Sequence, residues 1–235
     1  LILYRFSTET SVGKIRREQS RDKSWGEMLP GYKNAFRRIL ASQGTIFAII
    51  ISILVEISAM LGTTFWQIIA SRRIGIPDTL LPIFPMLKSI FSIVLFFTVI
   101  SHIRQTKLKW PLYWGFFSSI AGCILLVSIS KTGVLEYIIL SVSLVFETLG
   151  TAALGTLRES LVAIYADPEE RSGILALLQT TVMMASVPFA YIGGLLSDIS
   201  RVLPFVLIIA LSLLGILATG LFYGRSGAVA NIENE

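Results

Sequence analysis

The hydrophobic pattern of this chain consists of long apolar blocks separated by short polar connections. A helix needs about 20 predominantly apolar residues to cross a bilayer. Three blocks of this length carry no charge, and three others carry one charge near their centre, which is Glu56, Lys88 or Glu147. The blocks cover residues 45–70, 78–101, 110–130, 135–158, 173–196 and 202–223. Because they are solid rather than alternating, they predict helices and not barrel strands. We expect an all-α membrane protein with six transmembrane helices.

Composition supports lipid as the solvent for most of the chain. Hydrophobic residues make up 54% of the sequence and charged residues 15%, whereas soluble domains carry roughly 25% charged residues. The sequence contains one cysteine, Cys123, and one histidine, His102. It therefore excludes an intrachain disulfide and metal sites built on Cys or His. It also contains no nucleotide-binding loop. We expect neither a metal nor a cofactor, and we do not expect ATP to drive this chain.

The basic charge of the sequence is concentrated in its first segment. Residues 1–43 contain nine Lys or Arg and four Asp or Glu. A basic segment can bind nucleic acid, but this one runs directly into apolar helices, which favours a cytoplasmic segment beside a membrane. We expect residues 7–43 to be a basic cytoplasmic linker, either with an interfacial amphipathic helix or as a flexible tether. No nucleic-acid partner is expected.

The distribution of Lys and Arg also predicts the orientation in the membrane. Fifteen of these residues fall on the side that holds the first segment. Four fall on the other side, namely Arg72, Arg73, Lys131 and Arg201. Since Lys and Arg are enriched in cytoplasmic loops, we expect both termini to be cytoplasmic. The expected location is the plasma membrane, with the lipid bilayer as a partner.

The three charges inside the apolar blocks are the candidate functional residues. A charge at mid-bilayer costs at least about 2.5–3.5 kcal/mol, so such residues need partners. We expect Glu56, Lys88 and Glu147 to lie at similar depth, where Lys88 can pair with a carboxylate. Two hypotheses follow: a substrate or proton site near the membrane midplane, or a static ion pair that holds two helices together. Two carboxylates share one ammonium, which leaves one acid as a candidate for proton binding.

Polarity separates the expected helices into two kinds. The three blocks with central charges and the block 173–196, which contains Gln179 and Tyr191, are expected to line a polar cavity. Gln179 and Tyr191 are expected to add hydrogen bonds to the site. The blocks 110–130 and 202–223 carry no charge and are expected to face lipid or packing partners. A stretch of small residues from Gly150 to Gly155 indicates close helix packing.

This arrangement resembles the C-terminal half of the major facilitator superfamily. That family has two six-helix halves joined by a basic cytoplasmic loop, and the same four helices of the C-terminal half line its cavity. Residues 1–6 resemble the end of a preceding transmembrane helix, and 7–43 resemble the central loop. The segments Arg158–Gly173 and Pro188–Leu196 resemble the junction after the tenth helix and the eleventh helix. The resemblance implies a six-helix bundle over 44–225 and a cytoplasmic tail over 226–235.

The resemblance implies a function as well. It implies a secondary active transporter, and not an enzyme, that moves a small solute by alternating access with proton coupling. Trp66 and Phe65 beside mixed charges favour amphipathic solutes and efflux. It also implies a partner for the bundle, either an N-terminal six-helix half or a second copy. A cytoplasmic gate is expected from Arg158, Glu159, Glu169, Glu170 and Arg171.

Two other functions fit the residues less well. One is a non-transporting six-helix scaffold or receptor, for which the buried charges would be structural. The other is an intramembrane enzyme, because Glu169-Glu170-Arg171 superficially resembles a motif of glutamate-based membrane proteases. The lone His102 lies at a block end rather than at membrane depth, which argues against that enzyme.

Overall fold

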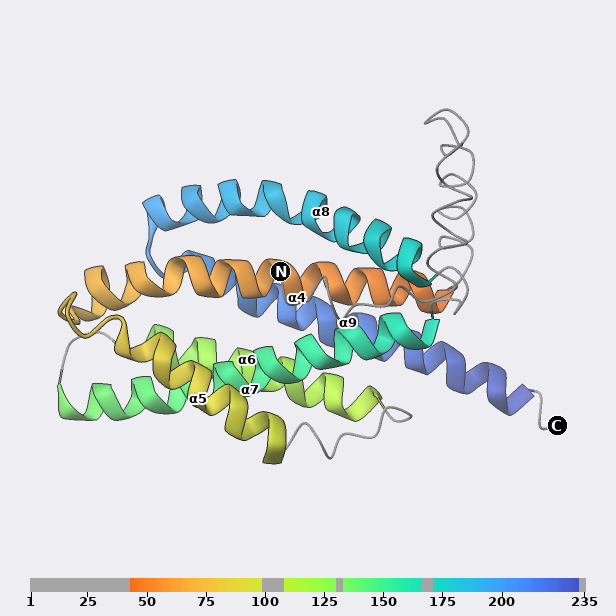
Figure 1. Ribbon diagram of the computed structural model, residues 1–235, viewed down its shortest axis with the longest axis horizontal. Coiled ribbons are helices and arrows are strands. Elements are labelled where there is room, and N and C mark those ends of the chain that lie inside the picture. Colours follow the sequence, from red (N-terminus) through yellow and green to blue (C-terminus); the bar gives the residue numbers. More distant parts are fainter. Residues whose placement is uncertain (1–42, 99–107, 130–132, 166–170, 233–235) are drawn as a thin grey trace, which may run out of the picture. The chain divides into compact units, whose positions relative to one another are not determined.

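The computed structural model of the protein describes residues 43–98, 108–129, 133–165 and 171–232, and these residues are helical apart from short connections. The elements are α4 (Gln43–Ile69), the π-helix η1 (Ala70–Ile74), α5 (Ile83–Thr98), α6 (Lys109–Ser128), α7 (Val134–Tyr165), α8 (Arg171–Ile199) and α9 (Leu203–Ile232) (Figure 1). No strand occurs in the described ranges. The expected all-α fold is therefore confirmed. The expected segments 1–6 and 7–43 lie outside the described residues, except for Gln43.

Five of the described helical segments are long and apolar enough to cross a membrane. They are Gln43–Ile74, Lys109–Ser128, Leu135–Leu161, Gln179–Ile199 and Leu203–Gly224. A sixth apolar helix, α5, has 16 residues and is shorter than a span. The structure therefore confirms five of the six expected spans by length and composition, and the sixth stays a prediction.

The late start of α5 has a local cause. The sequence pattern predicts a helix from residue 78, but residues 78–82 form turns. Pro82 has no backbone N–H and disfavours helical geometry in the residue before it. Pro85 lies in the first turn of α5, where the N–H groups have no intrahelical partner, so the helix tolerates it there. The prolines thus shorten the helix from its beginning.

The other helices differ from the expected spans at their ends. α7 runs to Tyr165 and α9 runs to Ile232, beyond the apolar blocks that end at 158 and 223. Residues 226–232 of the predicted tail continue the helix, and the cytoplasmic location of the tail stays a prediction. Neither extension contains a proline, and a helix that has begun gains one hydrogen bond for each residue added.

The closest packing in the bundle is between α6 and α7, which lie side by side (Figure 1). A Cβ at Gly122 would lie 2.8 Å from the backbone nitrogen of Glu147, and a Cβ at Gly150 would lie 2.8 Å from that of Ser119. The Ser143 hydroxyl donates to the Gly122 carbonyl oxygen at 2.8 Å. Glycine therefore permits backbone contact, as predicted for Gly150. A Cβ at Gly155 would meet nothing within 4 Å among the described residues of other elements, so close packing at this glycine is not seen there.

The remaining contacts place α4 and α9 at the centre of the described helices. α4 packs against α7, α8 and α9, and α9 packs against α4, α6 and α8. The fully buried side chains Ile51, Ile57 and Leu61 belong to α4, and Phe205 belongs to α9. The uncharged block 202–223 is thus a packing helix. α5 packs chiefly against α7, and Phe84 is its one buried side chain in the described range.

A turn at Gly75 follows α4 and η1. Gly75 caps the end of η1, and its φ of 83° is in the left-handed region that glycine adopts without strain. The N–H of Ile76 donates to the Ala70 carbonyl oxygen at 3.0 Å. Arg73 reaches across to α6 and donates from Nη2 to the Val127 carbonyl oxygen at 3.0 Å. The neighbouring Arg72 is left exposed at the same end of α4.

Candidate functional site

The first feature of the site is an ion pair between α5 and α7. The Lys88 ammonium lies 2.6 Å from Oε1 of Glu147 and donates a hydrogen bond to it. The Glu147 side chain is 9% exposed and that of Lys88 is 26% exposed. Glu147 Oε2 is buried and has no hydrogen-bond partner. The expected pairing of Lys88 with a carboxylate is confirmed, and one oxygen of that carboxylate remains unsatisfied.

A pocket of about 250 Å³ lies beside Lys88, between α4, α5 and α7. Its lining consists of Gly62, Thr63, Trp66, Gln67, Phe84, Pro85, Lys88 and Leu144. The rings of Trp66 and Phe84 are 5.3 Å apart between centroids. The indole Nε1 of Trp66 is buried without a hydrogen-bond partner. The pocket therefore combines apolar walls with an ammonium group. We call it the lysine pocket.

A much smaller cavity lies on the Glu147 side of the ion pair. It measures about 30 Å³ and is lined by Glu147, by the hydroxyl residues Ser58, Ser119 and Thr151, and by Cys123, among others. A cavity of this size has room for about one water molecule. Gly62 lines both this cavity and the lysine pocket, and a Cβ there would lie 3.3 Å from Glu147 Oε1. Glycine at this position leaves room for the carboxylate.

Glu56 does not join this pair, which corrects the prediction of a common depth for the three charges. Its Oε2 pairs with the Arg158 guanidinium of α7. Gly62, the α4 residue beside Glu147, follows Glu56 by six residues, which is about 9 Å along the helix axis. Each carboxylate therefore has its own cation. The expectation that two acids share one ammonium is wrong, because Arg158 reaches Glu56 from the adjacent α7.

The other predicted site residues lie apart from the ion pair. Tyr191 of α8 is 72% exposed, and Gln179 is exposed as well. Neither lines the lysine pocket. α8 packs against α4 and α9, whereas the lysine pocket opens between α4, α5 and α7. The structure does not bring these two residues to the site.

The expected gate residues are described only in part. Arg158 pairs with Glu56, and Glu159 is exposed. Glu169 and Glu170 lie outside the described residues, and of Arg171 only the backbone is described, as the first residue of α8. The gate network stays a prediction.

Sequence reasoning named Trp66 beside the charges but did not predict Gln67, Phe84 or the rest of the lining of the lysine pocket. Trp66 and Gln67 are adjacent in the last turns of α4 and follow Gly62 by four and five residues. The i, i+4 spacing of Gly62 and Trp66 puts them on one helical face, which is a signal that the sequence contains. Phe65 lies on another face, buried, where it contacts the position of Gly193. It does not line the pocket.

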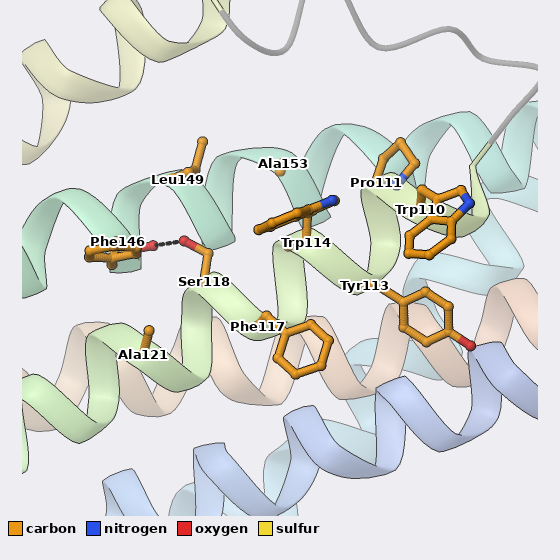
Figure 2. A pocket seen from close by; sticks show the side chains of 11 residues that line it. Trp110, Pro111, Tyr113, Trp114, Phe117, Ser118, Ala121, Phe146, Leu149 and Ala153 are labelled. Atoms are coloured by element: carbon orange, nitrogen blue, oxygen red, sulfur yellow. Dashed lines mark hydrogen bonds between the residues drawn. The ribbon is translucent and has the colours of Figure 1, made fainter.

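A larger hollow of about 810 Å³ lies on the surface of α6 and α7 (Figure 2). Figure 2 shows Trp110, Trp114 and Phe117 of α6 beside Phe146 and Leu149 of α7. Its Ser118 hydroxyl is engaged with the Phe146 carbonyl oxygen at 2.7 Å. The lining contains no charged residue. An exposed apolar face of this kind suits contact with lipid chains, and it lacks the groups that recognise a polar solute.

Within the described residues, no group of three or more His, Cys, Asp or Glu side chains is arranged to hold a metal ion. The chemistry that these side chains offer is hydrogen bonding, ion pairing and proton exchange. No family model matches the sequence, and no curated protein and no solved structure matches the chain.

Proposed function

We propose that the protein is a secondary active transporter that moves a small solute across the plasma membrane by alternating access. The observation that carries the proposal is the Lys88–Glu147 ion pair, placed between a pocket of about 250 Å³ and a water-sized cavity. Transporters place solute and ion sites near the midplane of the bilayer, between helices. A buried charge in a membrane helix is expensive and marks such sites.

The proposed coupling ion is the proton. Glu147 has one oxygen on Lys88 and one without a partner, so a proton on this carboxyl group would satisfy the free oxygen through a neighbouring water or hydroxyl group. Protonation also removes the charge that holds Lys88. Since α5 packs chiefly against α7, breaking this pair frees α5 to shift relative to α7 and change access to the lysine pocket.

The proposed membership is in the major facilitator superfamily, with this bundle as a C-terminal half. The described part of α5 leaves most of its surface exposed, as does the described part of α8 from Gln179 onward. Such apolar faces need a partner or lipid. We propose that an N-terminal six-helix half covers them, or else a second copy of this chain, and that both termini are cytoplasmic.

The test is flux in proteoliposomes that contain the full-length protein and an internal pH-sensitive dye. Small anionic, neutral and cationic solutes are added outside, and solute-dependent proton movement is recorded. We expect Glu147→Gln to lower the initial rate about tenfold or more, because it removes the group that exchanges the proton. Glu136→Gln is the matched control, since it makes the same change in the first turn of the same helix.

The alternative of a non-transporting scaffold or receptor makes the opposite prediction. A wild-type protein that moves no solute and no protons in this assay, while remaining folded, would support the scaffold. Normal solute-coupled proton movement in Glu147→Gln would overturn the assignment of Glu147 as the proton site while leaving transport standing. Equal losses in Glu147→Gln and Glu136→Gln would point to general damage to α7 and would likewise overturn the site.

A further inference from the structure

The lysine pocket has a cation and no acidic residue in its lining. Lys88 has three N–H donors, and one of them serves Glu147. Trp66 lines the same pocket, but its indole N–H is buried out of reach of the pocket space. Thr63 and Gln67 can each donate or accept a hydrogen bond. Because Lys88 has further N–H donors and no Asp or Glu lines the pocket, the pocket is complementary to a ligand that brings acceptor oxygens.

A second pocket adjoins the first at Gln67. It measures about 440 Å³ and is lined by Gln67, Ile68, Ser71, Arg72, Leu81 and Arg201. Its lining comes from the end of α4, from η1, from the turn before α5 and from the turn between α8 and α9. Gln67 belongs to the lining of both pockets. We call the second one the arginine pocket.

The lining of the arginine pocket carries positive charge and no negative charge. It contains two guanidinium groups and no Asp or Glu. Arg201 is held by its donation to the Ser197 carbonyl oxygen at 3.0 Å. Arg72 makes no hydrogen bond or ion pair with any residue that the structure describes. Two cations that converge on one polar pocket favour an anion, and guanidinium groups match carboxylate and phosphate geometry.

We propose that the solute is a small organic anion that carries an apolar group. Its anionic group is captured at Arg72 and Arg201 and then passes Gln67 to reach Lys88. Its apolar part packs between the walls formed by Trp66 and Phe84. This inference rests on the proposed transport function and specifies its substrate class. In the predicted orientation, the arginine pocket faces the outside of the cell. Its two arginines are two of the four basic residues expected on that side of the membrane.

The binding test uses benzoate as the probe, with benzamide and benzylamine as neutral and cationic controls of the same size. The full-length protein is placed in phosphatidylcholine nanodiscs, and affinity is measured by titration calorimetry. We expect benzoate to bind at least about tenfold more tightly than benzamide, because one charged hydrogen bond is worth about that factor. Benzylamine should not bind. Tighter binding of benzylamine than of benzoate would overturn the proposal.

Substitutions in the lysine pocket test whether benzoate binds there. Lys88→Gln should weaken benzoate binding about tenfold, and Lys88→Arg should restore part of it because the charge is kept. Trp66→Leu removes the aromatic wall and keeps an apolar side chain, so it should weaken benzoate binding severalfold while leaving the helix intact. It provides a readout if the Lys88 variants fail to fold. Benzoate affinity that is unchanged in Trp66→Leu and in a folded Lys88→Gln would overturn the lysine pocket as the site.

The arginine pocket is tested by kinetics. Arg72→Gln and Arg201→Gln should each slow benzoate association severalfold, and the difference should shrink at high salt because screening removes long-range attraction. Lys109→Gln makes the same charge change at an exposed residue that lines neither pocket, so it should leave association unchanged. Equal slowing by all three variants would show that only net charge matters and would overturn the arginine pocket.

Two further arms separate competing explanations. A lipid phosphate could occupy the arginines in place of a solute, so association is repeated in phosphatidylglycerol nanodiscs. Loss of the Arg72→Gln effect there would assign the pocket to lipid headgroups and overturn its role for the solute. Flux in the proteoliposome assay separates this inference from the transport function. Benzoate binding without any flux would support the anion-binding site and contradict the transport function. Flux of a cationic solute but not of benzoate would support the transport function and contradict the proposal that the solute is an anion.

Discussion

Replacing Lys88 with Met is expected to destabilise the helical unit by about 3–5 kcal/mol, because it leaves an unpaired charge at a buried carboxylate. Glu147 has a side chain that is 9% exposed, and its Oε2 already lacks a hydrogen-bond partner. Glu147→Gln should cost less, since Lys88 is more exposed and can still donate to the amide oxygen. The double replacement of both residues with Met should recover most of the loss, because an apolar pair needs no charge compensation.

The measurement is unfolding in mixed micelles, followed with a thiol-reactive dye. Cys123 is buried and free, so its labelling reports the opening of the α6–α7 region, and circular dichroism provides an independent signal. Arg158→Met is the matched control. Its partner Glu56 has a side chain that is 32% exposed, so the expected cost is smaller than that of Lys88→Met. Equal costs at the two pairs would contradict the assignment of the Lys88–Glu147 pair as the buried one.

The second large effect is expected at the contact of α6 and α7. Gly150→Ala places a methyl group 2.8 Å from the backbone nitrogen of Ser119 and 2.9 Å from the Gly115 carbonyl oxygen. Backbone atoms cannot rotate away as a flexible side chain can, so the two helices must separate. The expected cost is about 1–3 kcal/mol. Gly122→Ala should behave similarly, since its methyl group would meet the backbone of Glu147.

Gly155→Ala is the control for this effect. A Cβ at Gly155 meets nothing within 4 Å, so the same chemical change should stabilise α7 by up to about 1 kcal/mol through helix propensity. The same unfolding assay measures all three variants. A Gly150→Ala protein that is as stable as Gly155→Ala would show that α6 and α7 do not approach as closely as the structure places them.

Much of the fold follows from the order of apolar and polar residues. A block of twenty apolar residues has few alternatives to a helix in lipid, because each backbone N–H and C=O must find a partner within the segment. That constraint is local, so the helical type of the described segments is readable from the chain. Helix ends are less constrained. Pro82 delays α5 within a block that the apolar pattern alone starts at 78, and α9 continues past its apolar block to Ile232.

The site was predicted only in part, and the reason lies in the rotations of the helices. Sequence places Lys88 and Glu147 inside apolar blocks, and the cost of an unpaired charge implies that each has a partner. It does not say which face of α7 points to which neighbour. Glu147 and Arg158 lie eleven residues apart on α7, which is about three helical turns. They therefore reach partners at different depths: Glu147 pairs with Lys88, and Arg158 pairs with Glu56.

The sequence by itself determined that the chain is helical, that it contains apolar segments of membrane-spanning length, and that a few costly charges lie within them. These properties depend on local composition and backbone hydrogen bonding. The tertiary structure alone decided the two separate ion pairs, the exclusion of Gln179 and Tyr191 from the lysine pocket, and the presence of Trp66 and Gln67 in it. Those features depend on how α4, α5 and α7 are rotated and spaced, and Gly62 of α4 leaves room there for the Glu147 carboxylate of α7.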